Sequence, residues 1–307
     1  MSSLGLFDRH NFQLYLDFVV NRHQVWLKRQ AAEPGPWSED PILASRKFTN
    51  VFRVLDPGSQ FIFDLDDARL RPEVTLMRLF LYRHTGRVEA WEYLKQEMGD
   101  YPETRDLEFV LAEWQHYRDQ GNPIFTGAYL VYPQSPKAGT DKLESIIRLT
   151  QRLFDTASPE CIVWDFLEAK TQKEKFEVLR RTKGVADFMS MQILTDWGYT
   201  RHAQEDLENE FVVPGPGARR GIMKLVSTAE QKKFLWFAQA ELLMTEGCPE
   251  LDLGSRIRTP SIMDVQNTMC EFGKYVRFIE QGKTEFNPYV PAHPGHQPVP
   301  RTPKHWA

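Results

Sequence analysis

The 307-residue sequence has little cysteine, and it lacks any apolar run long enough to span a bilayer. Cys161, Cys248 and Cys270 stand far apart, and no cysteine or histidine pair has the spacing of a zinc site. These features exclude a disulfide framework and predict a reducing compartment. Residues 1–10 lack the apolar core of a signal peptide, so we expect an intracellular protein that does not bind membranes.

The sequence also lacks a strong excess of charge, with a formal net charge of −4. A strongly basic protein would bind nucleic acid over much of its surface, so any DNA contact here must be local. Basic residues gather in two short segments, Arg180–Lys183 and Arg219–Lys224. Apolar residues make up 41% and charged residues 26%, which excludes wholesale disorder, and we expect one helical domain over residues 1–282.

Helical periodicity accounts for most of the chain. Asp8 can cap a helix that runs to about Gln30. Asp40, followed by proline, can begin a second helix that runs to about Leu55 and ends at the turn sequence 56–58. Further helices are predicted at about 72–83, 88–97, 104–119, 141–155, 171–182, 187–197, 228–245 and 260–281.

Strand candidates are few and short. Phe61–Phe63 and Ala128–Tyr132 are the best of them. The sequence therefore predicts an all-α or nearly all-α fold. Residues 283–307 are rich in Pro and His and cannot form a core of their own, so they predict either a flexible tail or a strap laid over the domain.

A glycine turn within about 173–197 resembles the helix-hairpin-helix motif, in which a Gly-hydrophobic-Gly turn joins two helices and a small residue follows four positions later. Gly184-Val185-Ala186 matches the turn, and Ser190 matches the small residue. Glycine lets the backbone turn tightly, and amides at the start of the second helix can donate to a phosphate. Lys183 adds charge, so Lys183, Gly184, Val185 and Ala186 are the predicted DNA contacts. Because Ala186 replaces the second glycine, an ordinary αα-hairpin remains the alternative.

A second glycine-rich segment covers residues 212–221. Gly215 and Gly217 allow close backbone approach and are further predicted DNA contacts. Arg219 and Arg220 supply forked donors for phosphate or diphosphate. The Gly-Lys-Ser/Thr ending of a nucleotide-hydrolysing P-loop is missing. The alternative is a surface turn with solvated arginines.

Four acidic residues near these segments are candidates for base or metal chemistry: Asp196, Glu205, Asp206 and Glu208. Most of them are expected to be solvated. Asp196 differs because its neighbours in the predicted helix are apolar, and a carboxylate in apolar surroundings can gain the basicity that proton abstraction needs. The alternative for Asp196 is a carboxylate at the end of a helix, paired with an arginine.

Two further blocks are dense in polar residues. Asn50 and Arg53 are three apart and would share a face of the predicted helix. Glu271 and Lys274 belong to the block Asp264–Tyr275, whose polar residues have helical spacing. The default interpretation of that block is a salt-bridged helix face. A buried Asn50 would more often be a structural hydrogen-bonding residue than a ligand contact.

Taken together, these segments resemble the α-glutamyl/putrescinyl thymine pyrophosphorylase family, also described as amino acid:DNA transferases and as the helical domain of phage 5-hydroxymethyluracil DNA kinases. The resemblance runs in order from about Gln13 to Tyr275, and the combination is more specific than any single block. It rests on Pro36–Leu43, Lys47–Arg53, Gly184–Asp196, Gly215–Gly221 and Asp264–Tyr275.

The resemblance implies a helix-hairpin-helix DNA glycosylase-like helical domain that acts in bacteriophage thymine hypermodification. In that pathway 5-hydroxymethyluracil in DNA is pyrophosphorylated, and an amine of an amino acid or polyamine then displaces the diphosphate from the methylene carbon. Kinase members carry a P-loop domain that this sequence lacks, so the chain resembles the transferase partner or a divergent relative. It would act in the host cytoplasm if a phage encodes it, or in the nucleus of a eukaryote.

The resemblance also suggests roles for the residues. The target base is turned out of the duplex, Arg219 and Arg220 steady the leaving diphosphate, and Asp196 deprotonates the amine or the uracil ring. The expected partners are DNA, a small amine or amino-acid co-substrate and an upstream DNA-base kinase. Mg²⁺ bound with the diphosphate fits this chemistry, although no ligand set in the sequence declares it. The substrate pocket is assigned to Asn50, Arg53, Glu271 and Lys274.

Two alternatives stay open at this point. A helix-hairpin-helix DNA glycosylase acting on a modified base carries a catalytic aspartate beyond its hairpin, and Asp206 has a fitting separation from Gly184. However, the Val-Asp-Thr-His-like sequence of that site is absent, and Val213-Pro214-Gly215 stands near its place. A non-catalytic DNA-binding module would need the hairpin but none of the proposed catalytic residues.

Overall fold

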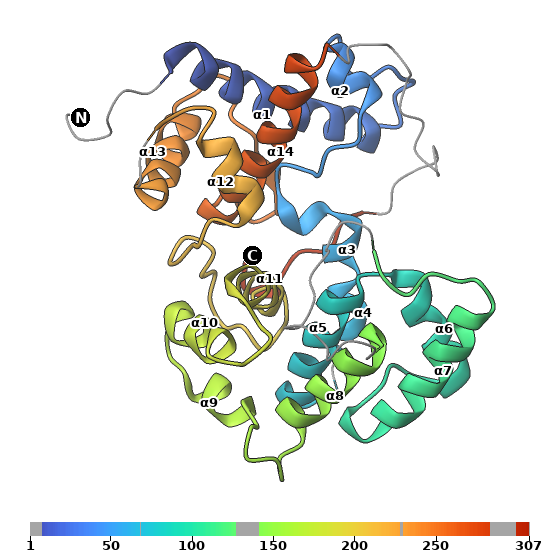
Figure 1. Ribbon diagram of the computed structural model, residues 1–307. Helices are drawn as coiled ribbons and strands as arrows, with labels where there is room; N and C mark the ends of the chain where they lie inside the picture. The colour runs from blue at the N-terminus through green and yellow to red at the C-terminus, as the bar shows by residue number, and fades with distance from the viewer. Residues whose placement is uncertain (1–7, 68, 127–140, 228–229, 283–298, 307) are drawn as a thin grey trace. The chain divides into compact units, whose positions relative to one another are not determined.

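The computed structural model describes residues 8–67, 69–126, 141–227, 230–282 and 299–306. The chain divides into two compact units, each described by itself below (Figure 1). Unit 1 combines residues 1–56 with 208–307, and unit 2 is continuous from Pro57 to Leu207. The single domain expected over residues 1–282 stays a prediction, since dense contacts within each unit do not show whether the two unfold together.

Helix α14 (Ile262–Glu280) is the centre of unit 1. It contacts α1 (Arg9–Gln30), α2 (Pro41–Ser45), α12 (Pro216–Ile222) and α13 (Gln231–Leu243). The unit also contains the 3₁₀ turns η1 (Arg53–Leu55) and η3 (Lys304–Trp306) and the antiparallel strands β1 (Leu251–Asp252) and β2 (Ile257–Arg258).

Capping side chains fix where the long helices of unit 1 begin. The Asp8 carboxylate accepts from the backbone amide of Asn11, and Ser261 forms a capping box with Asp264 at the start of α14. Aromatic rings then pack α1 against α14: Tyr15 and Phe272 meet edge to face with centroids 5.4 Å apart, and Phe18 lies 5.0 Å from Tyr275. Such pairs add to the stability that area burial alone provides.

Helix α5 (Pro72–Thr85) occupies the same central position in unit 2. Every residue from Val74 to Thr85 is buried, because α4 (Ile62–Leu65), α8 (Lys142–Phe154), α9 (Val163–Glu168) and α11 (Asp187–Trp197) all contact this helix. The other elements of unit 2 are α3 (Pro57–Gln60), α6 (Val88–Met98), η2 (Thr104–Asp106), α7 (Leu107–Asp119) and α10 (Gln172–Arg180).

Most of the expected secondary structure is confirmed. The helices expected between residues 72 and 281 are present with ends displaced by a few residues, and the Asp40 carboxylate accepts from the amides of Ile42 and Leu43. Apart from the short strands β1 and β2, the regular structure of the described residues is helical. Within those same ranges, no helix is both long and apolar enough to cross a membrane.

Two expectations are wrong, and one falls outside the described residues. The helix that begins after Asp40 ends at Ser45 rather than near Leu55, because residues 46–52 leave the helix and bond to α14. The strand candidate Phe61–Phe63 is not a strand: Phe61 precedes α4, and the other two residues begin this helix, since a short apolar run fits a buried helix as well as a strand. The candidate at 128–132 lies outside the described ranges.

The last described residues, 299–306, belong to unit 1. Trp306 is only 2% exposed, and its carbonyl oxygen accepts a hydrogen bond from Nε of Arg256. Of the two possibilities for the Pro- and His-rich segment, a packed strap therefore describes these residues.

Candidate functional site

The turn between α10 and α11 has the backbone geometry of a tight helical hairpin. Gly184 has a φ of +100°, in the left-handed region that favours glycine, and buried Val185 donates its amide to the Thr182 carbonyl at 3.0 Å. Ala186 has a φ of −89°, so the second turn position does not require glycine. Lys183 is exposed beside the turn. Ala186 therefore fits this turn, while the helix-hairpin-helix motif and DNA binding by these residues stay predictions.

The two helices of the hairpin, α10 and α11, pack together in the core, and a surface ion pair also links their residues. Ser190 is fully buried on α11, which contacts α10, so a small residue stands at a buried position as the motif requires. On the surface, Nε of Arg180 donates to Oδ1 of Asp187 at 2.7 Å. That exposed pair adds little stability, because solvent screens it.

Asp196 lies at the end of α11 and is fully buried. Arg83 on α5 donates to both of its carboxylate oxygens, with Nη2 2.5 Å from Oδ1. This bidentate contact matches the alternative of a helix-end carboxylate paired with an arginine. A carboxylate held in this way could accept a proton from a substrate only after the pair separated. Its role as a base stays a prediction.

The other acidic candidates have different surroundings. Glu205 is exposed and Asp206 is half-buried. Glu208 is only 7% exposed and lies 2.6 Å from Nη2 of Arg258, which is also buried. Glu208 is therefore not a solvated charge, since Arg258 on β2, far away in the sequence, pairs with it.

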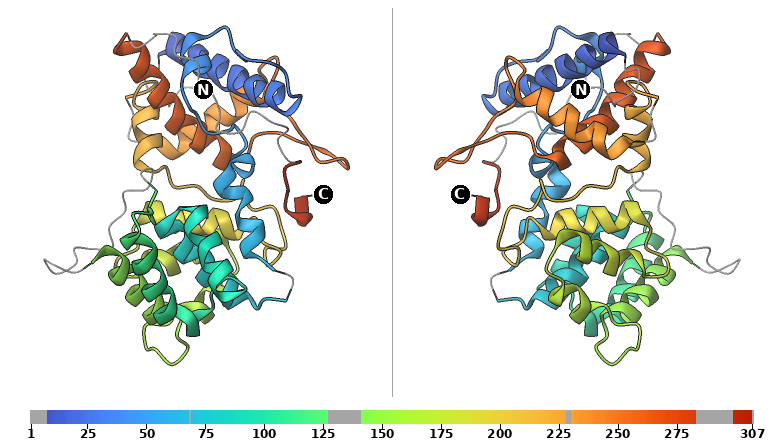
Figure 2. Two further views of the ribbon diagram at one scale, coloured as in Figure 1. Left: turned by 90° about the vertical axis from the view of Figure 1, so that its right-hand side faces the viewer. Right: turned by 90° about the vertical axis from the view of Figure 1, so that its left-hand side faces the viewer.

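The glycine-rich segment that begins at Gly215 forms a helix rather than a surface turn. Pro216 takes the first helical position of α12, and the glycines that follow face α14. A Cβ on Gly217 would lie 2.1 Å from Sγ of Cys270, and a Cβ on Gly221 would lie 1.9 Å from the Met269 carbonyl oxygen. Both views of Figure 2 show α12 and α14 side by side. Close helix packing therefore explains Gly217 and Gly221, while DNA contact by Gly215 and Gly217 stays a prediction.

Arg219 and Arg220 lie on the exposed side of this helix. Nε of Arg219 donates to the Pro214 carbonyl at 2.9 Å, and this hydrogen bond restrains the side chain of Arg219. Because the glycine contacts hold α12 against α14, both guanidiniums stand on a rigid support. They belong to unit 1, whereas Asp196 and the hairpin belong to unit 2.

The two polar blocks of unit 1 lie against each other. Polar side chains along α14 bond to the segment that follows α2. Oε2 of Glu271 accepts from the amide of Thr49 at 3.0 Å, and Nζ of Lys274 donates to the Lys47 carbonyl at 2.8 Å. Lys274 also lies 2.6 Å from Glu271. The block is therefore more than a salt-bridged helix face, because it fastens an irregular segment to α14.

Asn50 is the centre of this arrangement. Its Oδ1 accepts from Nη2 of Arg22 at 2.7 Å, its Nδ2 donates to the Leu55 carbonyl at 2.9 Å, and its amide donates to Oδ1 of Asp56 at 2.8 Å. This is the structural hydrogen-bonding role that a buried asparagine was expected to have. Asn50 and Arg53 do not share a helix face, since Asn50 precedes the turn η1 that begins at Arg53. Both side chains are buried, at 9% and 5% exposure, and their contact with substrate stays a prediction.

Two carboxyls in unit 1, those of half-buried Asp56 and buried Asp264, have a raised pKa. Burial raises the pKa of Asp56 to about 6, although the hydrogen bond from Asn50 opposes the change. Burial, followed by repulsion from Glu208, raises the pKa of Asp264 to about 7, although Arg258 opposes it. Oδ1 of Asp264 also accepts from the backbone amide of Arg53 at 2.8 Å. A carboxyl with a pKa near neutrality can exchange a proton at physiological pH.

Sequence reasoning missed the basic partners of these acids. Arg22 is 5% exposed and Arg258 is 6% exposed. The sequence could have indicated that Arg22 is buried, because its spacing places it on the same helix face as the buried residues Phe18 and Val25 of α1. Arg258 lies on a two-residue strand after a glycine-containing turn, and no pattern in the sequence indicates that it is buried.

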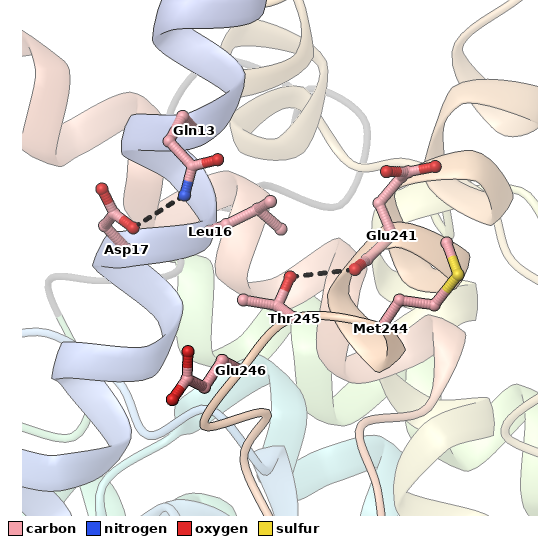
Figure 3. A pocket seen from close by; sticks show the side chains of 7 residues that line it. All are labelled: Gln13, Leu16, Asp17, Glu241, Met244, Thr245 and Glu246. Carbon is pink, nitrogen blue, oxygen red and sulfur yellow. Dashed lines mark hydrogen bonds between the residues drawn. The ribbon is translucent and has the colours of Figure 1, made fainter.

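A hollow of about 550 Å³ in unit 1 lies apart from the predicted residues (Figure 3). Its lining includes the carboxylates of Asp17, Glu241 and Glu246, so it would repel a diphosphate or the DNA backbone. Across the described ranges, no group of three or more His, Cys, Asp or Glu side chains could hold a metal ion. The proposed Mg²⁺ thus has no protein ligand set among those residues.

Comparison with known proteins shows the family to which the chain belongs. A family model described as the helical domain of 5-hmdU DNA kinase matches residues 9–284. The 5-hmdU DNA kinase of Bacillus phage SP10 is 25% identical over 301 residues, covering 87% of this chain and 45% of the phage protein. The chain thus spans less than half the length of that relative. No solved structure matches the chain.

Proposed function

Because the chain belongs to the family of 5-hmdU DNA kinase helical domains, we propose that it acts on 5-hydroxymethyluracil-derived bases in DNA and exchanges diphosphate for an amine. In this reaction the amine nitrogen forms a bond to the methylene carbon of the base. The bond from that carbon to the diphosphate oxygen breaks, and the amine gives up a proton. The family supports thymine hypermodification in DNA, and the amine transfer is the finer part of the proposal.

The observation that carries the proposal is the exposed pair Arg219 and Arg220 on a helix held rigidly by its glycines. Diphosphate gains charge on its leaving oxygen as the carbon–oxygen bond breaks. Guanidiniums carried on a packed helix can stabilise that charge with little reorganisation at the moment of reaction. The acidic hollow beside α1 cannot do this.

The hairpin supplies the proposed hold on DNA. Lys183 is exposed beside the left-handed Gly184, and α11 begins three residues later, so its first amides can donate to a phosphate. This contact would be independent of base sequence. It explains how a chain with a net charge of −4 could bind DNA through one local surface.

Two residues compete for the role of base. Asp196 is the candidate from the sequence, but Arg83 donates hydrogen bonds to both of its carboxylate oxygens. The Asp264 carboxyl has a pKa of about 7, which suits proton transfer at neutral pH, and it lies among buried groups of unit 1, the unit that carries Arg219 and Arg220. Asp196→Asn and Asp264→Asn separate the two, since each keeps the shape of the side chain and removes its basicity.

The test is mass spectrometry of nucleosides from DNA that bears pyrophosphorylated 5-hydroxymethyluracil, after incubation with the full chain and a mixture of amines. An amine joined to the base supports the proposal. An abasic site would show a glycosylase, and unchanged DNA that is still bound would show a binding module. Either result would overturn amine transfer.

Single-turnover rates and DNA affinities of the same variants then test the arginines. Arg219→Ala or Arg220→Ala should slow the reaction by roughly tenfold to a thousandfold, the range for losing one electrostatic stabiliser, with a smaller effect on DNA affinity. Arg277→Ala, at another exposed position in unit 1, is the matched control. Equal loss of rate and affinity would make Arg219 and Arg220 backbone clamps instead.

The partial coverage of the phage kinase favours a second candidate. The chain matches less than half of a protein named as a kinase, so a helical domain of this family could present 5-hydroxymethyluracil DNA to a kinase. Adding ATP and a 5-hydroxymethyluracil DNA kinase to the assay distinguishes this role. Faster phosphorylation of the base, without amine transfer, would support the second candidate.

A further inference from the structure

The strap 299–306 ends in an aromatic contact with a buried cation. The guanidinium carbon of Arg258 lies 3.5 Å from the centroid of the Trp306 ring, which is a close stack. The Trp306 amide donates to the Pro303 carbonyl at 3.0 Å, and its carbonyl oxygen accepts from Arg256. One short turn, η3, therefore holds the indole in place.

The surface under the indole is a built polar site. Arg258 is 6% exposed, and its Nη2 lies 2.6 Å from Oε2 of Glu208, which is equally buried. The Asp264 carboxyl is close enough for both groups to affect its proton affinity, and its Oδ2 accepts from the amide and hydroxyl of Ser261. Glu208 thus holds the guanidinium of Arg258 through Nη2, while the indole of Trp306 covers the guanidinium face.

A planar ring against the face of a fixed arginine is also the way in which proteins hold an unstacked nucleobase. An indole and a pyrimidine base are both flat and aromatic, and each can cover the same guanidinium face. The difference lies in how the ring arrives. The indole is brought by a short segment of the chain, whereas a base would be brought by DNA.

We propose that Arg258 is a stacking site for a pyrimidine base of DNA, and that the indole of Trp306 fills this site until a base displaces it. The inference rests on the proposed function, in which the chain handles a base turned out of DNA. It makes the strap 299–306 an internal competitor of the substrate. Binding of a base should then release the strap.

The first test compares two labelled duplexes by fluorescence anisotropy. One carries a single bulged 5-hydroxymethyluracil, and the other carries an abasic unit at the bulge. Trp306→Ala should bind the base-containing duplex roughly tenfold more tightly than the unchanged chain, since a competing aromatic stack is gone, and should bind the abasic duplex equally well. Trp164→Ala, at an exposed tryptophan of unit 2, is the control and should change neither affinity. Equal effects on both duplexes would overturn the proposal.

The second test does not depend on the folding of a variant. Hydrogen exchange of residues 299–306 in the unchanged full chain should increase on binding the base-containing duplex and stay constant on binding the abasic one. No increase with either duplex would show that Trp306 is a permanent part of the core. Base-dependent release without any amine transfer would uphold the stacking site and refute the proposed reaction, so the two proposals fail separately.

Discussion

Gly221→Ala tests whether the glycines of α12 exist for helix packing. The new Cβ would lie 1.9 Å from the Met269 carbonyl oxygen and 2.8 Å from the carbonyl carbon. Both atoms belong to the α14 backbone, so neither can rotate away, and the two helices must separate. Alanine gains about 1 kcal/mol of helix propensity over glycine. Overpacking costs about 1–3 kcal/mol, and the rigid backbone favours the upper end, so we expect a net loss of about 2 kcal/mol.

Gly217→Ala provides the matched control. Its Cβ would meet Sγ of Cys270 at 2.1 Å, but the nearest atom beyond that sulfur is the Cys270 Cβ at 3.3 Å. Adding Cys270→Ala should therefore recover most of the stability that Gly217→Ala loses, whereas it should not rescue Gly221→Ala.

Urea denaturation followed by far-UV circular dichroism measures these differences as shifts in midpoint at constant slope. A Gly221→Ala chain as stable as the unchanged one, or more stable, would refute close packing of α12 on α14. The rigid support assigned to the neighbouring arginines would then be lost as well.

Three further outcomes follow from the described contacts. Gly184→Val combined with Lys183→Glu should weaken DNA binding and flatten its dependence on salt in anisotropy titrations, and an unchanged slope in a folded variant would reduce the hairpin to a structural turn. Arg83→Met should lower the free energy of unfolding by about 3–5 kcal/mol in urea, because it leaves the buried Asp196 carboxylate without this partner; a loss below about 1 kcal/mol would contradict the ion pair. The pKa of Asp264 rises from 3.8 to about 7 on folding, so between these values the native state keeps a proton that the unfolded chain releases, and stability should fall as pH rises. Asp264→Asn should flatten that fall in a pH series of urea denaturations, and an unchanged profile would assign the titration to another group.

The long helices could be read from the sequence because their signals are local. Asp8, Asp40 and Ser261 cap helices through hydrogen bonds that span two or three residues. Apolar spacing then gives the approximate length of the long helices, although the helix after Asp40 ends at Ser45 rather than near Leu55. Gly184 and its neighbours indicate the hairpin. The family resemblance was also accessible, since it depends on residue order. Its helical-domain part is confirmed, while the α-glutamyl/putrescinyl name stays a prediction.

Contacts between segments far apart in the sequence decided the structural roles of the glycines of α12 and of Asn50. Gly217 was predicted from the sequence to contact DNA, but a missing Cβ serves close approach of any backbone, and α14 is the neighbour of both Gly217 and Gly221. DNA contact by Gly217 stays a prediction. Asn50 was assigned to a substrate pocket from the sequence, and only the structure shows its partners Arg22 and Asp56. Contact of Asn50 with substrate stays a prediction.

The charge state of the buried acids also came only from the tertiary structure. The sequence does not show the partners of Asp196, Glu208 and Asp264. Arg83 pairs with the first, Arg258 pairs with the second, and burial raises the pKa of the third. The sequence by itself determined where the long helices lie, because capping and periodicity act within a few residues. Only the tertiary structure decided which carboxyl meets a cation and which keeps a proton, because solvation and Coulomb forces depend on distance through space rather than along the chain.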